Sequence, residues 1–304
     1  MEAERASVTA QVTAFARAWH ARREEVKIFD DRLAVELFTE AEWAFFTKSL
    51  SDCLAFFNPE LAATRPDPAD AVSWIVRHQN GPITLSRSRY AEDRLEDAYL
   101  RGVRQYVILG AGLDTFAFRR PDSMEGLSVL EVDHPATQDR KRRRLAELGW
   151  KIPEFLGFLP LDFARRSLAE GLAESAFDPR KPAFFNWLGV TYYLDRDAVM
   201  DTLRTVSRTA GNAVVFDYLE PAALEPEHPI RRVRLMVEIA RRAGEPMRTS
   251  WEPSALKGDL EAAGLRLLED LGPAEIQDRF FRGRVDGYRA FENVRFALAE
   301  TAGA

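Results

Sequence analysis

The sequence predicts an α/β fold in which a mostly parallel sheet follows a helical N-terminal region. Two observations support this prediction. From Gln105 onward, short apolar runs alternate with helical stretches, which is typical of parallel strands joined by crossover helices. Within that part of the chain, the apolar run 107–109 leads directly into Gly110-Ala111-Gly112, as a buried strand does where it turns sharply into a helix.

The first hundred residues are expected to be mostly helical. Helix-forming residues with apolar spacing cover four stretches: 10–22, 33–50, 71–78 and 90–102. The last of them ends at Gly102, the residue type that commonly terminates a helix. We therefore expect a helical extension over residues 1–103, ahead of a core domain over residues 104–304.

The core domain is expected to contain about seven short strands. The apolar runs that predict them are 106–109, 129–132, 155–159, 183–188, 213–216, 265–268 and 292–297. Helices are expected between the strands over 137–148, 167–174 and 195–207. After Pro221 a helical segment rich in proline and arginine interrupts this rhythm. That interruption predicts a helical lid inserted at about 221–250.

Composition and charge narrow the class of protein. Of the 304 residues, 46% are hydrophobic and 30% charged, as in a soluble enzyme. No apolar run approaches the roughly 18 residues of a membrane span, and the charged N-terminus does not resemble a secretory signal, so we expect a cytoplasmic protein without membrane contact. A formal charge of −6 argues against nucleic acid as a partner. The basic run 140–144 is instead expected to be a solvated helix face.

A metal site is not expected. Cys53 is the only cysteine, which excludes an intrachain disulfide and a metal site built from several cysteines. The four histidines do not have the spacing of metal ligands.

The glycines at 110 and 112 predict a site for an adenosyl cofactor. A bare backbone allows close approach of a ligand, and a helix N-terminus offers free N–H groups. Asp133 lies 21 residues beyond Gly112 at the end of a second apolar run, where an acid commonly binds ribose hydroxyls. A dinucleotide fingerprint would need a third glycine where this chain has Thr115. The pattern therefore favours S-adenosylmethionine, which has no phosphate, over a nicotinamide dinucleotide.

Other candidate site residues follow the expected strands, because ligands of open α/β sheets bind beyond the carboxyl ends of the strands. Asp162 can bind the amine of an adenine beside the Phe163 ring, or it can cap the next helix; both interpretations stay open. His134 lies near the cofactor and is expected to have a structural role. Tyr192 and Tyr193 follow the fourth strand, where a methyl acceptor would lie, and they are equally suited to the core.

Several motifs in order resemble the bacterial branch of the leucine carboxyl methyltransferase-like family of S-adenosylmethionine-dependent methyltransferases. The resemblance covers most of the chain. The motifs that carry it are FDDRLA at 29–34, SRSR at 86–89, the segment 102–119 around the two glycines, EVDHP at 131–135, and RFF at 279–281 with Arg284 and Asp286-Gly287.

The resemblance implies a Rossmann-like class I methyltransferase sheet of seven strands with a helical N-terminal extension and an inserted lid. It also implies that Arg87 pairs with the cofactor's carboxylate, that Gly110 approaches the methionine portion, and that Asp133 binds the ribose. Leu188 stands where many members carry a glutamate, which implies that one cofactor contact is lost. The residues expected at the cofactor are Arg87, Gly110, Ala111, Gly112, Asp133, His134, Asp162, Phe163 and Leu188.

The function expected from these observations is O-methylation of a small molecule by S-adenosylmethionine, with a carboxylate as the favoured acceptor. A carboxylate is already ionised at neutral pH and needs no general base, whereas a phenol would need one, for which Tyr192, Tyr193 or His134 are the candidates. The alternative is a protein that holds an adenosyl ligand or a partner on a methyltransferase fold without turnover. The observation that supports this alternative is Leu188 at the position where many family members carry a glutamate. A nicotinamide-dependent dehydrogenase is disfavoured by Thr115.

Overall fold

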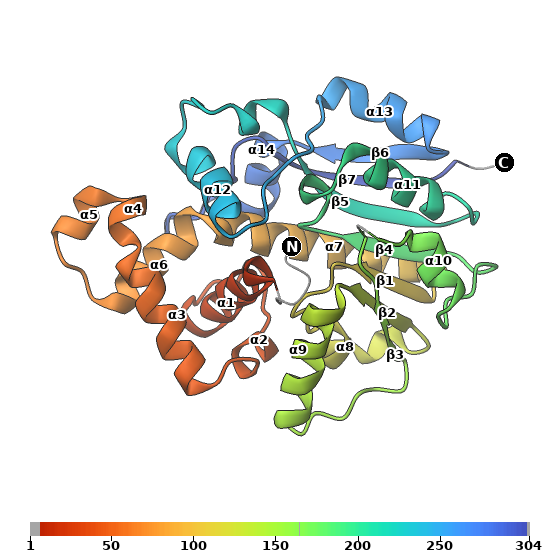
Figure 1. The fold of residues 1–304 in the computed structure, drawn as a ribbon, viewed down its shortest axis with the longest axis horizontal. Helices are drawn as coiled ribbons and strands as arrows, with labels where there is room; N and C mark the ends of the chain where they lie inside the picture. The colour runs from red at the N-terminus through yellow and green to blue at the C-terminus, as the bar shows by residue number, and fades with distance from the viewer. Residues whose placement is uncertain (1–6, 164, 303–304) are drawn as a thin grey trace.

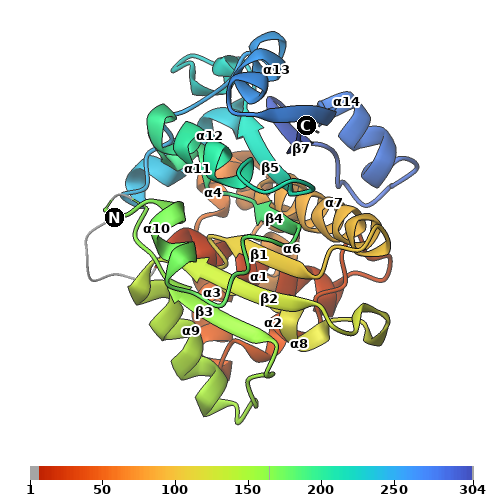
Figure 2. The same cartoon turned by 90° about the vertical axis from the view of Figure 1, so that its right-hand side faces the viewer.

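The computed structural model describes residues 7–163 and 165–302. Residues 1–6, which the sequence assigns to the N-terminal extension, and residues 164, 303 and 304, assigned to the core domain, lie outside the described part. One seven-stranded sheet has the order β3-β2-β1-β4-β5-β7-β6. Figure 2 shows the strands stacked from β3 at the bottom to β7 near the top. The predicted α/β fold with its mostly parallel sheet is confirmed.

The strands lie close to the predicted apolar runs. Their bounds are β1 Gln105–Leu109, β2 Ser128–Asp133, β3 Leu156–Pro160, β4 Ala183–Trp187, β5 Ala213–Leu219, β6 Leu265–Leu271 and β7 Val294–Thr301. β1 to β5 are parallel, while β7 runs antiparallel to both β5 and β6. β1, β4 and β5 are buried along their whole length, which explains their continuous apolar sequences.

The described part of the predicted N-terminal extension is mostly helical. Its helices are α1 Val8–Arg23, α2 Leu33–Glu36, α3 Glu40–Asp52, α4 Leu54–Phe57, α5 Pro59–Ala63, α6 Pro68–His78 and α7 Asn80–Leu100. The expected start of the last helix at residue 90 was wrong by ten residues. α7 begins at Asn80 and includes Gly81 and Pro82 in its first turn, where a proline costs no hydrogen bond.

The helices of the core domain alternate with its strands. They are α8 Phe116–Arg119, α9 Pro135–Glu147, α10 Leu168–Ala173, α11 Arg196–Val206, α12 Arg231–Arg242, α13 Pro253–Ala262 and α14 Pro273–Ile276. Short helical turns η1 Asp122–Met124, η2 Thr191–Tyr193, η3 Pro221–Leu224 and η4 Gln277–Phe281 connect them. In Figure 1, α12 lies near the end of α7, away from α10 and α11. The helix after the glycine loop, α8, is a single turn.

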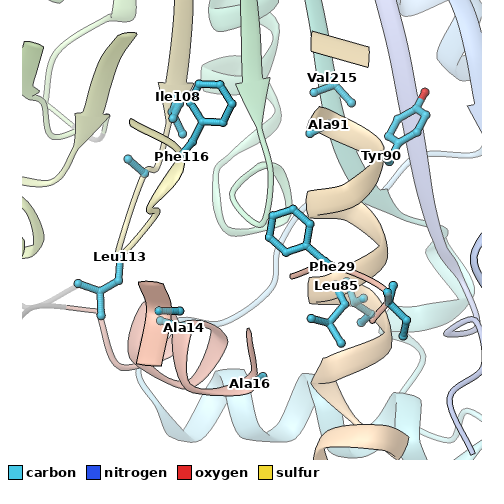
Figure 3. Packing of buried hydrophobic residues seen from close by; sticks show 14 of the residues in the cluster. Ala14, Ala16, Phe29, Leu85, Tyr90, Ala91, Ile108, Leu113, Phe116 and Val215 are labelled. Carbon is cyan, nitrogen blue, oxygen red and sulfur yellow. The ribbon is translucent and has the colours of Figure 1, made fainter. Parts of the chain in front are cut away.

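Two apolar cores lie on the two faces of the sheet. On one face, Tyr106, Ile108 and Val215 pack with residues of α1 and α7. On the other face, Val107 and Leu109 pack with residues of α10, α11 and α13. Figure 3 shows Ala14 of α1 beside Leu113, which follows the glycine loop. The N-terminal extension is therefore part of the main core and borders the carboxyl edge of the sheet.

In the described part of the chain, no helix combines the length and the apolar character that a bilayer span requires.

Candidate cofactor and active site

The glycine loop has a backbone that only glycine adopts easily. Gly110 has φ +74° and Gly112 has φ +54°, both in the left-handed region. A Cβ atom at Gly110 would lie 2.4 Å from Cγ2 of Val190, and one at Gly112 would lie 3.2 Å from Cβ of Ala10. The loop is thus bordered by α1 on one side and by the segment after β4 on the other.

Asp133 lies at the end of β2 and holds the glycine loop. Its Oδ2 accepts a hydrogen bond from the Gly112 N–H, and its Oδ1 accepts one from the His134 N–H at 2.6 Å. Burial raises the pKa of Asp133, against the lowering effect of these two backbone donors. A carboxylate has about four lone-pair positions, so two remain for further donors. Asp133 is the last residue of β2, as the sequence predicts, and its role at the ribose stays a prediction.

His134 has the structural role that the sequence predicts. Its Nδ1 accepts a hydrogen bond from the Ala136 N–H at 3.3 Å and thereby caps α9. Its Nε2 lies 3.8 Å from Oδ2 of Asp162, which is half-buried beyond the end of β3. The side chain that caps α10 is Ser167, so the Asp162 side chain is not the cap of that helix. Phe163, next to Asp162, is also half-buried.

Arg87 lies in a buried ion pair at the carboxyl ends of β4 and β5. Its Nη1 donates to Oδ2 of Asp217 at 2.7 Å and to the hydroxyl of Tyr192 at 3.0 Å. The Gly189 N–H donates to the other oxygen of Asp217 at 2.6 Å. Gly189 has φ +72°, and a Cβ atom there would lie 2.5 Å from Nη2 of Arg87. The guanidinium therefore packs directly against bare backbone.

The two tyrosines after β4 pack against each other. Tyr192 is 7% exposed and Tyr193 is half-buried, with their ring centroids 4.7 Å apart. Burial raises the pKa of both hydroxyls above the ordinary value. Both hydroxyls consequently stay protonated at neutral pH, which suits a hydrogen-bond donor and does not suit a general base.

Two polar residues at this edge were missed by the sequence analysis. Asp217 is fully buried within β5, and Asn186 is 6% exposed within β4. Asn186 donates from Nδ2 to the Tyr106 hydroxyl at 2.7 Å, while its buried Oδ1 has no donor among the described residues. The available signal was a polar side chain inside an otherwise apolar strand, since such residues are costly to bury unless they have partners.

Thr115, at the position of a third glycine, has a structural role. Its hydroxyl lies against Oδ1 of Asp31, and Asp31 also forms a buried ion pair with Arg17 of α1 at 2.8 Å. Arg17 donates in turn to the Leu113 carbonyl at 2.7 Å. This network joins α1 and the FDDRLA motif to the glycine loop.

The basic run 140–144 is only in part the solvated helix face that the sequence predicts. Lys141 is 1% exposed and forms a buried ion pair with Glu131 of β2, so the prediction is wrong at this position. Burial raises the pKa of Glu131 to about 7. Arg144 donates to the carbonyls of Glu36 and Leu37. These residues join α9 to the sheet and to the N-terminal extension.

Comparisons with known proteins identify the family of this chain. Residues 10–207 match the family described as leucine carboxyl methyltransferase. A protein of Bacillus subtilis named "Putative S-adenosyl-L-methionine-dependent methyltransferase YktD" is 37% identical over 302 residues, which is 98% of this chain and 99% of that protein. The chain belongs to the leucine carboxyl methyltransferase family. Membership places it among the S-adenosylmethionine-dependent methyltransferases and confirms the resemblance seen in the sequence.

Two further matches cover most of this chain. A Mycolicibacterium smegmatis protein with the same kind of name is 32% identical over 223 residues, covering 72% of this chain and 68% of that one. Among solved structures, a DUF574 family protein from Streptomyces avermitilis covers 98% of both chains with a TM-score of 0.59 and 14% identity. At that identity the likeness supports the fold alone.

Proposed function

We propose that this methyltransferase transfers the methyl group of S-adenosylmethionine to a carboxylate oxygen of a small molecule. The observation that carries the proposal is the surroundings of the predicted acceptor position. The hydroxyls of Tyr192 and Tyr193 are buried with raised pKa values, and His134 is engaged in capping α9. None of these three candidates is poised to remove a proton, so an acceptor that is already ionised fits best.

The residues at the carboxyl edge of the sheet fit the cofactor. The space at Gly110 would be filled by any Cβ atom, Asp133 keeps acceptor capacity beyond its two backbone donors, and Asn186 holds a buried oxygen without a donor among the described residues. We assign the ribose to Asp133, the adenine to the surroundings of Asp162 and Phe163, and the methionine end to Gly110 and Arg87. His134, Ala111, Gly112 and Leu188 complete the lining.

Bound S-adenosylmethionine supplies an electrophilic methyl group on its sulfonium. The task of the chain is then to align an acceptor oxygen with that methyl group and to exclude water. The segment 221–250 is suited to cover the acceptor, because the Arg248 N–H donates to the Tyr192 carbonyl at 2.7 Å. We propose that this segment is the lid and that residues 1–103 are the helical extension that closes the cofactor side.

The test is a measurement of S-adenosylhomocysteine formation with separate sets of carboxylic acids and phenols. Methyl esters release methanol on mild alkaline treatment, whereas methyl ethers do not. We expect turnover with carboxylic acids, an alkali-labile product, and retention of that activity in Tyr192→Phe and Tyr193→Phe. Turnover confined to phenols with an alkali-stable product would contradict the proposal, as would loss of turnover in either tyrosine variant with unchanged cofactor binding.

A further inference from the structure

The buried pair of Arg87 and Asp217 borders the glycine loop. Val190, which lies against Gly110, is the residue after Gly189, and Gly189 lies against the Arg87 guanidinium. Gly189 also donates its N–H to Asp217. A ligand that passes Gly110 toward β4 and β5 therefore meets a cation and an anion side by side.

Both members of the pair keep hydrogen-bonding capacity. In the described part of the chain, the two hydrogen bonds of the Arg87 guanidinium come from Nη1, so Nη2 keeps its donor capacity. Oδ1 of Asp217 accepts one hydrogen bond, from Gly189, and a carboxylate oxygen can accept two. The pair thus offers donors suited to a carboxylate and an acceptor suited to an ammonium group.

A second observation points to a ligand with donors at the same place. Asn186 is 94% buried, since its exposed fraction is 6%, and its Oδ1 has no donor among the described residues. It lies on the face of the sheet that α7 covers, as its bond to Tyr106 shows, and Asp217 follows Val215 by two positions on that same face. An unpaired buried acceptor is costly, and a ligand donor removes the cost.

The strand register brings the carboxylate of Asp217 on β5 next to the segment that follows β4. Trp187 of β4 is paired with Phe216 of β5, and the Gly189 N–H, two residues beyond Trp187, donates to Asp217, the residue after Phe216. Adjacent strands are about 4.8 Å apart, within reach of one side chain. Although Leu188 is apolar, Asp217 therefore supplies a negative charge at this end of β4 and β5.

We propose that Asp217 binds the α-ammonium group of the cofactor's amino-acid end while Arg87 binds its α-carboxylate, with Asn186 as an additional acceptor for the ammonium. This inference rests on the proposed placement of the cofactor. The pair and the amino-acid end are each neutral overall, so binding exchanges opposite charges between them without leaving a net charge buried. A buried ion pair contributes little stability compared with apolar packing, which favours a role in ligand binding for this one.

The test is calorimetric titration with three ligands: S-adenosylhomocysteine, its analogue without the α-amino group, and its analogue without the α-carboxylate. We expect the wild type to bind the deamino analogue about tenfold more weakly than S-adenosylhomocysteine, from the loss of charge-assisted hydrogen bonds. In Asp217→Asn that preference should disappear, because affinity falls for S-adenosylhomocysteine and for the decarboxylated analogue and stays the same for the deamino analogue.

The matched control is Asp270→Asn. Asp270 of β6 also accepts from a tyrosine hydroxyl, that of Tyr218 at 2.9 Å, and from an arginine, Arg295 at 3.1 Å. We expect this variant to keep the wild-type ligand preference. The ratio of two affinities within one variant does not depend on the fraction of folded protein.

Two results would overturn the inference. Weakening of S-adenosylhomocysteine and of the deamino analogue in Asp217→Asn, with binding of the decarboxylated analogue unchanged, would mean that Asp217 only positions Arg87. A wild type that binds the deamino analogue as tightly as S-adenosylhomocysteine would exclude an ammonium contact even if the variant did not fold. Failure of the proposed acceptor chemistry would appear instead in the carboxylate assay, with these ligand preferences intact, and a wild type that binds none of the ligands would overturn the cofactor placement itself.

Discussion

Replacement of Gly110 by alanine tests the glycine loop most sharply. The left-handed backbone at φ +74° costs a residue with a Cβ atom about 1–2 kcal/mol. The new Cβ atom would also lie 2.4 Å from Cγ2 of Val190, and such overpacking costs about 1–3 kcal/mol more. In a chain of this length each kcal/mol lowers the melting temperature by about 2 °C. Gly110→Ala should therefore lower it by about 4–10 °C.

The matched control is Gly126→Ala. Gly126 has nearly the same φ, +78°, but a Cβ atom there would meet nothing within 4 Å. It should lower the melting temperature by about 2–4 °C through backbone strain alone. Calorimetry should show S-adenosylhomocysteine binding unchanged in Gly126→Ala and weakened at least about tenfold in Gly110→Ala, because the methyl group occupies the cofactor's approach. Equal affinity in the two variants would refute the role of the loop.

The remaining predictions concern buried charges. Burial, and to a lesser extent the charge of Lys27, lowers the pKa of His20 to about 3. The contribution of His20 to the free energy of unfolding is therefore fully present above about pH 6.5 and is lost as the pH falls toward 3. Between pH 8 and pH 5, denaturant titrations should show a loss that is about 2 kcal/mol smaller in His20→Gln than in the wild type; equal losses would contradict this. Lys141→Met should lower the free energy of unfolding by about 3–5 kcal/mol because Glu131 loses its partner. Adding Glu131→Leu should restore most of the lost free energy, because no unpaired charge then stays buried. A double variant as unstable as Lys141→Met would contradict the ion-pair account.

The parts of the fold that local sequence determines could be predicted. β1 and the glycine loop were evident because an apolar run meets Gly110 and Gly112 within a few residues, and Asp133 ends the next strand. Membership of the family confirms the resemblance that these motifs carried. The role of Asp133 at the ribose stays a prediction, as do the other ligand contacts.

The parts that depend on strand order could not be predicted. Asp217 and Arg87 are 130 positions apart in the sequence. They meet only because β5 lies beside β4 and because α7 crosses the same face of the sheet. In the sequence, Lys141 is one of five consecutive basic residues, and the pattern predicts that all five are solvated. It is buried because α9 packs against β2, where Lys141 pairs with Glu131, two positions before Asp133. Burial of a charge is a property of tertiary packing, which composition and spacing do not encode.

The central claim is that the cofactor binds at the glycine loop with its ribose on Asp133. Calorimetric titration with S-adenosylhomocysteine of the wild type, Asp133→Asn and the exposed control Asp122→Asn tests it most directly. We expect wild-type binding with a Kd on the order of micromolar, unchanged in Asp122→Asn and weakened about 10- to 100-fold in Asp133→Asn, through loss of charged hydrogen bonds. Wild-type affinity in Asp133→Asn would contradict the account.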